Sequence, residues 1–125
     1  MPQAIVIDLG SIKLKGEFND SRAGRALASR LPFNLSLSRW GDEYYGNADQ
    51  DLGRHGDPGR EVMAVGELGY HDETGWFCVF FGPTPASQGD EPRAAVSLQP
   101  VGMVDGDWAA VRRLGGRVRA TVSAA

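Results

Sequence analysis

The sequence predicts a mainly β fold, a closed barrel or sandwich of about eight short strands with two short helices as plugs. Its 17 glycines and 7 prolines in 125 residues indicate frequent turns, which favour short strands. Segments 11–18 and 117–122 alternate apolar and polar residues with the period of a half-buried strand. Because no repeat or linker divides the chain, we expect one domain over residues 1–125.

The N-terminal part predicts a hairpin followed by a helix. Apolar residues alternate over 5–9 and again over 11–18, with the turn at 9–11. Polar side chains at 19–21 can cap a helix in which apolar residues recur every four positions. We expect Pro32 to end this helix.

A further strand and a long loop follow the helix. Residues 33–37 alternate again, and the strand continues to Trp40, with Gly41 offering a place to bend. Residues 46–61 are rich in glycine and nearly devoid of apolar side chains. This composition predicts an exposed, flexible loop.

The most apolar segment, 76–81, predicts a strand because aromatic and β-branched residues dominate it. This predicted strand comes after residues 62–70, in which apolar residues are irregularly spaced, and after a predicted turn at 72–75. Alternation divides its side chains into two faces, one facing the barrel and the other lying under a helix or lining a groove. The two sets are Trp76, Cys78 and Phe80, and Phe77, Val79 and Phe81.

The C-terminal part predicts a strand, a short helix and a last strand. The first strand, 96–104, is expected to be bent or at an edge because Pro100 cannot donate a ladder hydrogen bond. Asp107 can cap a helix that ends at Gly115-Gly116. The segment 117–122 closes the chain as a regular strand.

Composition and charge exclude several classes of function. A net charge of -3 and a pI near 5.3 give no general attraction to nucleic acids or anionic membranes. No apolar run approaches the ~20 residues of a membrane span, and the N-terminus lacks a signal-peptide pattern. The single cysteine, Cys78, cannot form an internal disulfide. We therefore expect a cytoplasmic protein that binds neither nucleic acid nor membrane.

The middle and end of the chain resemble a cyclophilin. The segments that carry the resemblance are GWFCVFFGPTPAS, VGMVDGDWAAVRRL and RVRATVS. The chain is also similar to minimal prokaryotic cyclophilin-like domains of unknown function, in LP…WGDEYYG, REVMAVGELGYH and FCVFFGPTPAS. This resemblance implies a closed eight-stranded barrel with a helix over each open end.

The sequence departs from the catalytic pattern of cyclophilins. The resemblance implies an arginine that donates a hydrogen bond to the prolyl nitrogen and weakens the amide resonance. Arg39 is the only candidate for that arginine, and Val79-Phe80 stands where cyclophilins carry Ala-Asn. Weak or atypical prolyl isomerase activity is therefore an alternative, not the main hypothesis.

The stretch after the apolar strand offers a candidate ligand site. Pro83 and Pro85 restrict the backbone, so the hydroxyls of Thr84 and Ser87 are held with little freedom beside aromatic residues. If one face of the preceding strand is open, Phe80 is the expected pocket floor. The alternative is that the strand is wholly core and the hydroxyls only satisfy their own turn.

A second candidate site lies in WGDEYYG, residues 40–46. The resemblance to cyclophilin-like domains implies that this motif lies near the barrel cavity, where Glu43 and Tyr45 would meet Thr84 or Tyr70. Paired carboxylates such as Asp42 and Glu43 can perform acid and base chemistry when their pKa values differ. The alternative interpretation is a solvated turn.

The hypothesis is a domain that binds a small molecule or peptide segment in an aromatic-lined pocket. The histidines share no ligand spacing, so we expect no metal, and no motif calls for a cofactor. A structural or partner-binding module is the third alternative, and the oligomeric state is left open. The expected ligand-binding residues are Trp40, Glu43, Tyr45, Tyr70, Phe80, Thr84 and Ser87.

Overall fold

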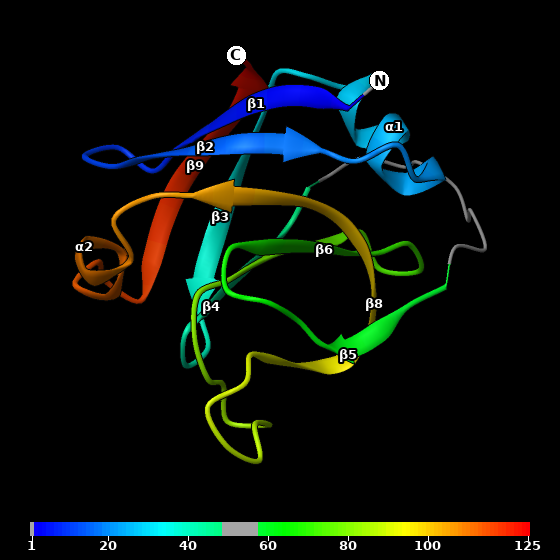
Figure 1. Cartoon of the computed structure of the whole chain (residues 1–125). Coiled ribbons are helices and arrows are strands. Elements are labelled where there is room, and N and C mark those ends of the chain that lie inside the picture. The colour runs from blue at the N-terminus through cyan, green and yellow to red at the C-terminus, as the bar shows by residue number, and fades with distance from the viewer. Residues whose placement is uncertain (1, 49–57) are drawn as a thin grey trace.

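The computed structural model describes residues 2–48 and 58–125, which form a β-barrel with a short helix at each end (Figure 1). Helices α1 (Arg22–Ala28) and α2 (Trp108–Arg112) begin at the caps Ser21 and Asp107, whose side chains accept N–H bonds from Gly24 and Ala110. The strands are β1 (Gln3–Asp8), β2 (Lys13–Phe18), β3 (Phe33–Arg39), β4 (Glu43–Asn47), β5 (Arg60–Val62), β6 (Glu67–His71), β7 (Trp76–Phe80), β8 (Arg93–Asp105) and β9 (Arg117–Ala124).

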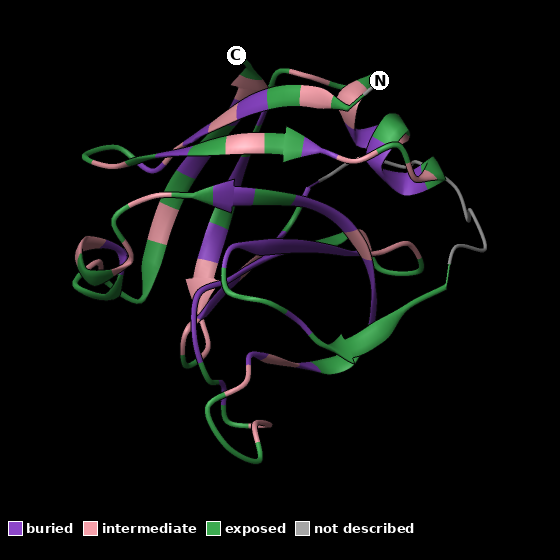
Figure 2. Cartoon of the chain, viewed as in Figure 1, coloured by how far each residue is buried: buried purple, intermediate pink, exposed green. Residues whose placement is uncertain are grey.

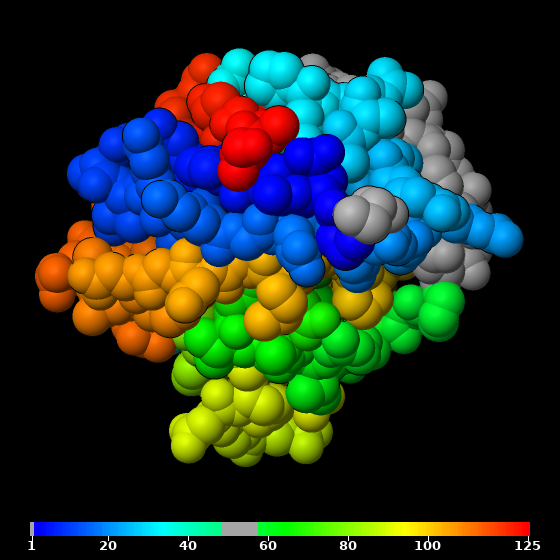
Figure 3. Space-filling view, turned by 45° about the horizontal axis from the view of Figure 1, so that its top comes forward, coloured from blue at the N-terminus to red at the C-terminus, as the bar shows by residue number. Residues whose placement is uncertain are grey.

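Eight of the strands close the barrel. They pair in the order β2-β1-β9-β3-β4-β7-β6-β8, and β8 returns to β2 through antiparallel pairs from Lys15↔Asp105 to Phe18↔Gly102. Figure 3 shows the C-terminal residues (red) against the N-terminal strand (blue), as the pairing of β1 with β9 requires. The predicted closed eight-stranded barrel with two short helices is therefore confirmed.

The barrel interior holds the main hydrophobic core. Along β1 and β2, Ile5, Ile7, Leu14 and Phe18 are completely buried, and buried and exposed positions alternate along these strands (Figure 2). Helix α1 adds Leu27 at one end and α2 adds Val111 at the other. The helices thus cover the two openings that barrel closure leaves.

The first half of β8 leaves the barrel wall. Residues Gln99 to Met103 pair with β6, whereas Arg93 and Leu98 pair with β5, a ninth strand outside the barrel. A register shift opposite Pro100 accompanies the change of partner, which matches the predicted bend there. Arg60 ties β5 to β6 by a bidentate ion pair with the Glu67 carboxylate, at 2.9 and 2.5 Å.

Two sequence predictions about segment boundaries were wrong. Residues 43–47 form β4, because the ladder with β7 extends from Glu43↔Phe80 to Asn47↔Trp76, so Glu43 is not part of a solvated turn. Strands β4 and β5 also take both ends of the predicted loop 46–61. The expected flexibility of the loop centre concerns residues 49–57, which lie outside the described residues.

Candidate functional site

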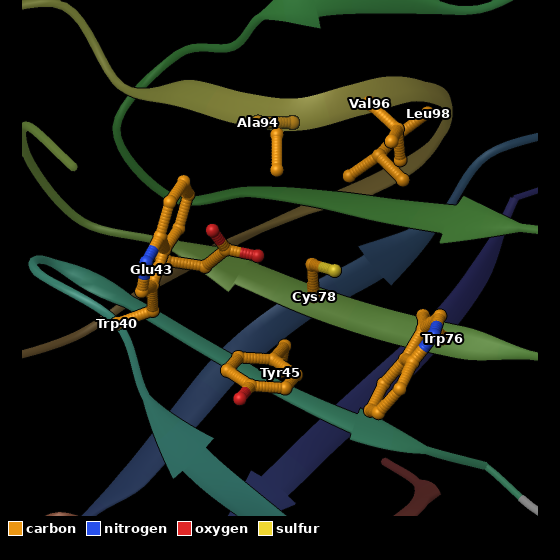
Figure 4. Close-up of a pocket in the computed structure, with 9 residues that line it drawn as sticks. Trp40, Glu43, Tyr45, Trp76, Cys78, Ala94, Val96 and Leu98 are labelled. Atoms are coloured by element: carbon orange, nitrogen blue, oxygen red, sulfur yellow. The ribbon is translucent and has the colours of Figure 1, made fainter. Parts of the chain in front are cut away.

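A pocket of about 390 Å³ lies on the outer face of the barrel, between β4 and β7 and the first half of β8. In Figure 4, Ala94, Val96 and Leu98 form one wall and face Glu43, Tyr45 and Cys78 on the other. Its lining residues are Trp40, Glu43, Tyr45, Trp76, Cys78, Ala94, Ala95, Val96 and Leu98.

Strand alternation explains why these side chains face outward. In β7, Phe77 and Val79 belong to the main core, so Trp76, Cys78 and Phe80 point to the other side of the wall. In β4, Tyr44 is buried inside, and Glu43 and Tyr45 therefore point out. The predicted division of strand 76–81 into two faces is confirmed.

A second, smaller hydrophobic cluster supports the pocket from below. It consists of Met63, Cys78, Phe80, Ala94 and Leu98, with Tyr45 packed against it. The Tyr45 and Trp76 rings meet edge to face with centroids 5.1 Å apart. Trp76 is 38% exposed, so this aromatic pair lies where the pocket meets solvent.

Glu43 is the charged group of the pocket. The residue is only 5% exposed, and its Oε1 is buried without a hydrogen-bond partner among the described residues. Burial raises the pKa of this carboxyl to about 7, although a hydrogen bond with Cys78 acts in the opposite direction. Near neutral pH the pocket therefore holds a carboxyl group that is present in both protonation states.

Cys78 is the partner of this carboxyl. Burial, followed by the charge of Glu43 and the hydrogen bond to it, raises the pKa of the Cys78 thiol well above its usual range. The thiol therefore stays protonated near neutral pH and is a poor nucleophile.

The structure brings three of the seven predicted ligand residues together in the pocket, namely Trp40, Glu43 and Tyr45. Phe80 is completely buried in the small cluster and does not line the pocket. Tyr70, on β6, belongs to the main core. The expected meeting of Glu43 and Tyr45 with Tyr70 is therefore not seen.

Thr84 and Ser87 lie in the loop after β7, which projects from the body of the molecule (yellow-green in Figure 3). The Thr84 hydroxyl donates to the Arg93 carbonyl at 2.5 Å, and the Ser87 hydroxyl donates to the Glu91 carbonyl. Ser87 Oγ also accepts the Thr84 N–H at 2.9 Å. As in the alternative interpretation of this turn, both hydroxyls bind backbone groups, the Ser87 hydroxyl within its own loop and the Thr84 hydroxyl at the first residue of β8.

The contacts of the Arg39 side chain lie outside the pocket. Its Nη2 lies 2.9 Å from Asp42 Oδ1, and its guanidinium lies 5.0 Å from the Phe81 ring centroid and 5.6 Å from that of Tyr44. Nη1 donates to the Arg112 carbonyl at 3.2 Å. These contacts join β3 to the end of α2 and leave no donor directed at the pocket.

Sequence reasoning missed two groups of lining residues. Trp76 and Cys78 share the outward face of β7 with Phe80, so the alternation that selected Phe80 also indicated them. The second group comes from β8 and has only apolar side chains, which do not mark a site in the sequence: Ala94, Ala95, Val96 and Leu98. They reach the pocket only because β8 changes partner and crosses over the outer face.

The described residues contain no group of three or more His, Cys, Asp or Glu side chains that could hold a metal ion. Within the same ranges, neither helix has the length and apolar character needed to cross a membrane.

Comparisons with known proteins agree with this architecture. The sequence profile of a family described as cyclophilin-like matches residues 3–123. The solution structure of a hypothetical protein from Archaeoglobus fulgidus is similar, with a TM-score of 0.80 at 22% identity. That similarity covers 99% of this chain and 95% of the other, and it supports the fold alone. No curated protein matches the sequence.

Proposed function

This chain belongs to the cyclophilin-like family, and from that premise we propose that it binds a small organic molecule or a peptide segment, without efficient prolyl isomerase activity. One observation carries the proposal: three aromatic rings and a buried carboxyl oxygen, which has no hydrogen-bond partner in the described part of the chain, surround one open cavity of about 390 Å³. Pockets for small molecules are commonly about 300–1,000 Å³, mostly apolar, with a few polar groups that orient the ligand.

The rigidity of the walls supports binding. Glu43, Tyr45, Trp76 and Cys78 stand on two strands paired over five successive residues. The opposite wall is held by β5 and by the ion pair between Arg60 and Glu67. A pocket on such paired strands loses little conformational entropy when a ligand binds.

The absence of an arginine from the pocket lining, among the described residues, supports a function other than prolyl isomerisation. The resemblance to cyclophilins implies an arginine that donates to the prolyl nitrogen. Arg39 instead directs its donors to Asp42 and to backbone carbonyls. Among the described residues, the pocket thus presents the Glu43 acceptor and no arginine donor.

The three tryptophans provide a direct test. Trp40 and Trp76 line the pocket, whereas Trp108 stacks on Phe81 of the main core, with ring centroids 6.1 Å apart. In an NMR screen of aromatic fragments and short peptides, we expect bound compounds to shift the indole N–H signals of Trp40 and Trp76 and leave that of Trp108 unchanged. A screen without such compounds, or one whose compounds move Trp108 equally, would contradict the proposal.

Filling the pocket gives a matched control. Ala95 is an exposed residue of the lining, and Ala109 is an exposed residue of α2. Ala95→Phe should abolish the shifts at Trp40 and Trp76 without unfolding the protein, and Ala109→Phe should preserve them. Equal binding by both variants would place the bound compound elsewhere.

A further inference from the structure

The buried carboxyl of the pocket indicates what kind of ligand it accepts. We propose that the ligand is a protonated amine on an apolar body, with its N–H directed at Glu43 and its apolar part among Trp40, Tyr45 and Trp76. This inference rests on the proposed function and narrows it to one chemical class.

The first argument is the unused acceptor. Nearly all buried polar atoms in proteins have a hydrogen-bond partner, yet Glu43 Oε1 has none among the described residues. Within residues 2–48 and 58–125, Cys78 is the one side chain whose hydrogen bonding lowers the pKa of this carboxyl. Figure 4 shows the carboxyl group pointing toward the space between the two walls. The open acceptor position is therefore available to a donor on the ligand.

The second argument is charge. In residues 2–48 and 58–125, no lysine or arginine forms an ion pair with Glu43. Arg39 and Arg112 bind Asp42, and Arg93 binds Glu91 and lies 3.7 Å from Glu61. A carboxylate buried without a counter-charge is costly, and a cationic ligand would supply that charge.

The surroundings of Glu43 contain few other titratable groups. Cys78 faces it from β7 and Tyr45 lies beside it on β4, while the β8 wall contributes only Ala94, Ala95, Val96 and Leu98. Burial raises the pKa of Glu43 to about 7, because the pocket solvates the charged form of the carboxyl poorly. A cation favours the charged form, so binding near pH 6 should release a proton.

The third argument is the aromatic lining. Tyrosine and tryptophan faces attract cations through the ring quadrupole, and this attraction grows when the cation leaves water. Trp40, Tyr45 and Trp76 all contribute to the same cavity as Glu43. An anion would meet both the carboxylate and these negative ring faces, so the same lining rejects it.

Three probes of similar shape test the charge. With 2-phenylethylamine, 2-phenylethanol and 3-phenylpropanoate at pH 8, titration calorimetry should show the amine binding at least about tenfold more tightly than the alcohol. We expect no detectable binding of the propanoate. A short lysine-containing peptide then tests whether the pocket also binds an ammonium group that is part of a peptide. Binding of either the free amine or the peptide supports the proposal.

Glu43→Gln keeps the size of the side chain and removes its charge. The variant should bind amine and alcohol equally, whereas Glu17→Gln, at an exposed position on β2, should keep the preference for the amine. At pH 6, calorimetry in two buffers of different ionisation enthalpy should detect proton release from the unmodified protein and none from Glu43→Gln.

The outcomes separate this inference from the proposed function. If the alcohol or the propanoate shifts Trp40 and Trp76 as strongly as the amine does, or if Glu43→Gln keeps the preference, the pocket binds ligands and the amine proposal is wrong. If no probe or fragment shifts these signals, both proposals are wrong.

Discussion

Glu43 on β4 and Cys78 on β7 lie on one face of neighbouring strands of the barrel wall, and each affects the pKa of the other. The register Glu43↔Phe80 and Tyr45↔Cys78 makes the two residues diagonal neighbours on one face of the β4–β7 pair. Because that face is covered by the first half of β8, the pair is removed from water. The outer wall of the barrel thus carries two ionisable side chains, and no lysine or arginine of residues 2–48 and 58–125 forms an ion pair with Glu43.

The stability of the protein should fall as pH rises from about 4.5 to about 7. Glu43 has its pKa raised by burial to about 7, so the folded state binds more protons than the unfolded state in this window. Protonated Glu43 contributes its full share to the free energy of unfolding below the pKa that it has in the unfolded chain. This share, about 3 kcal/mol in total, is lost as the pH rises through the pKa of the folded state. Chemical denaturation at several pH values measures it.

Glu43→Gln is the control for this pH dependence and should remove the decline. Glu91 does not interfere, because the Gln88 N–H and Arg93 lower its pKa to about 2, below this window. The same slope in both proteins would show that another group is responsible.

Replacing Cys78 should shift the titration of Glu43. The thiol hydrogen bond lowers the pKa of Glu43, so Cys78→Ala should raise that pKa above its value of about 7. Cys78→Ser keeps a donor at the same place and should change the pKa less. Carbon-13 NMR of the glutamate carboxyl carbons reports both variants, and a lower pKa in the alanine variant would contradict the assigned role.

Arg39→Ala should destabilise the protein by about 2 kcal/mol, because it removes an ion pair, contacts with two rings and hydrogen bonds to the carbonyls at the end of α2. Arg39→Lys should recover little of this loss, since an ammonium lacks the planar fork. Arg113→Ala, at an exposed position, is the control with little expected effect. Unchanged fragment binding in Arg39→Ala would agree with a structural role, and lost binding in a folded variant would contradict it.

Gly16→Ala should destabilise the barrel at its closure. A Cβ atom at Gly16 would lie 1.9 Å from the Met103 carbonyl oxygen and 2.6 Å from Val104 Cα, both on β8. We expect a loss of about 3 kcal/mol, because the β2 and β8 backbones would have to separate. Gly116→Ala meets nothing within 4 Å and should be nearly neutral in thermal unfolding. Similar effects of the two changes would argue against this close strand contact.

Thr84→Val should loosen the loop after β7 without weakening the pocket. The change removes the hydrogen bond to the Arg93 carbonyl and costs about 1 kcal/mol. Amide hydrogen exchange at Ala86 should become faster, because its N–H is bonded to the lost hydroxyl at 3.2 Å. Ser11→Ala, in the exposed turn after β1, provides a hydroxyl deletion with no expected effect. A large loss of fragment affinity in Thr84→Val would show that this loop is part of the binding site.

The elements that sequence patterns predicted best are those with one clear periodicity. The hairpin of β1 and β2 and the strand β9 follow a period of two, and α1 follows caps and four-residue spacing. Strand β4 was missed because its sequence, EYYGN, combines an acid, two tyrosines and a glycine and shows no such alternation. Its strand character comes from pairing with β7, which the local sequence does not encode.

The sequence by itself determined most of the strands, the two helices and the two-faced strand 76–81, because alternation and capping are local properties of the chain. The choice of a closed barrel over a sandwich came from the resemblance to cyclophilins, because the pairing of β2 with β8 that closes the barrel is long-range. The sequence also identified Trp40, Glu43 and Tyr45 as chemically distinctive. The tertiary structure decided which residues share the pocket. Pro100 and the register shift beside it send the first half of β8 to β5, and only that crossing encloses Glu43 and Cys78 beneath small apolar side chains. The raised pKa of Glu43 follows from this long-range burial, which depends on how distant segments pack together.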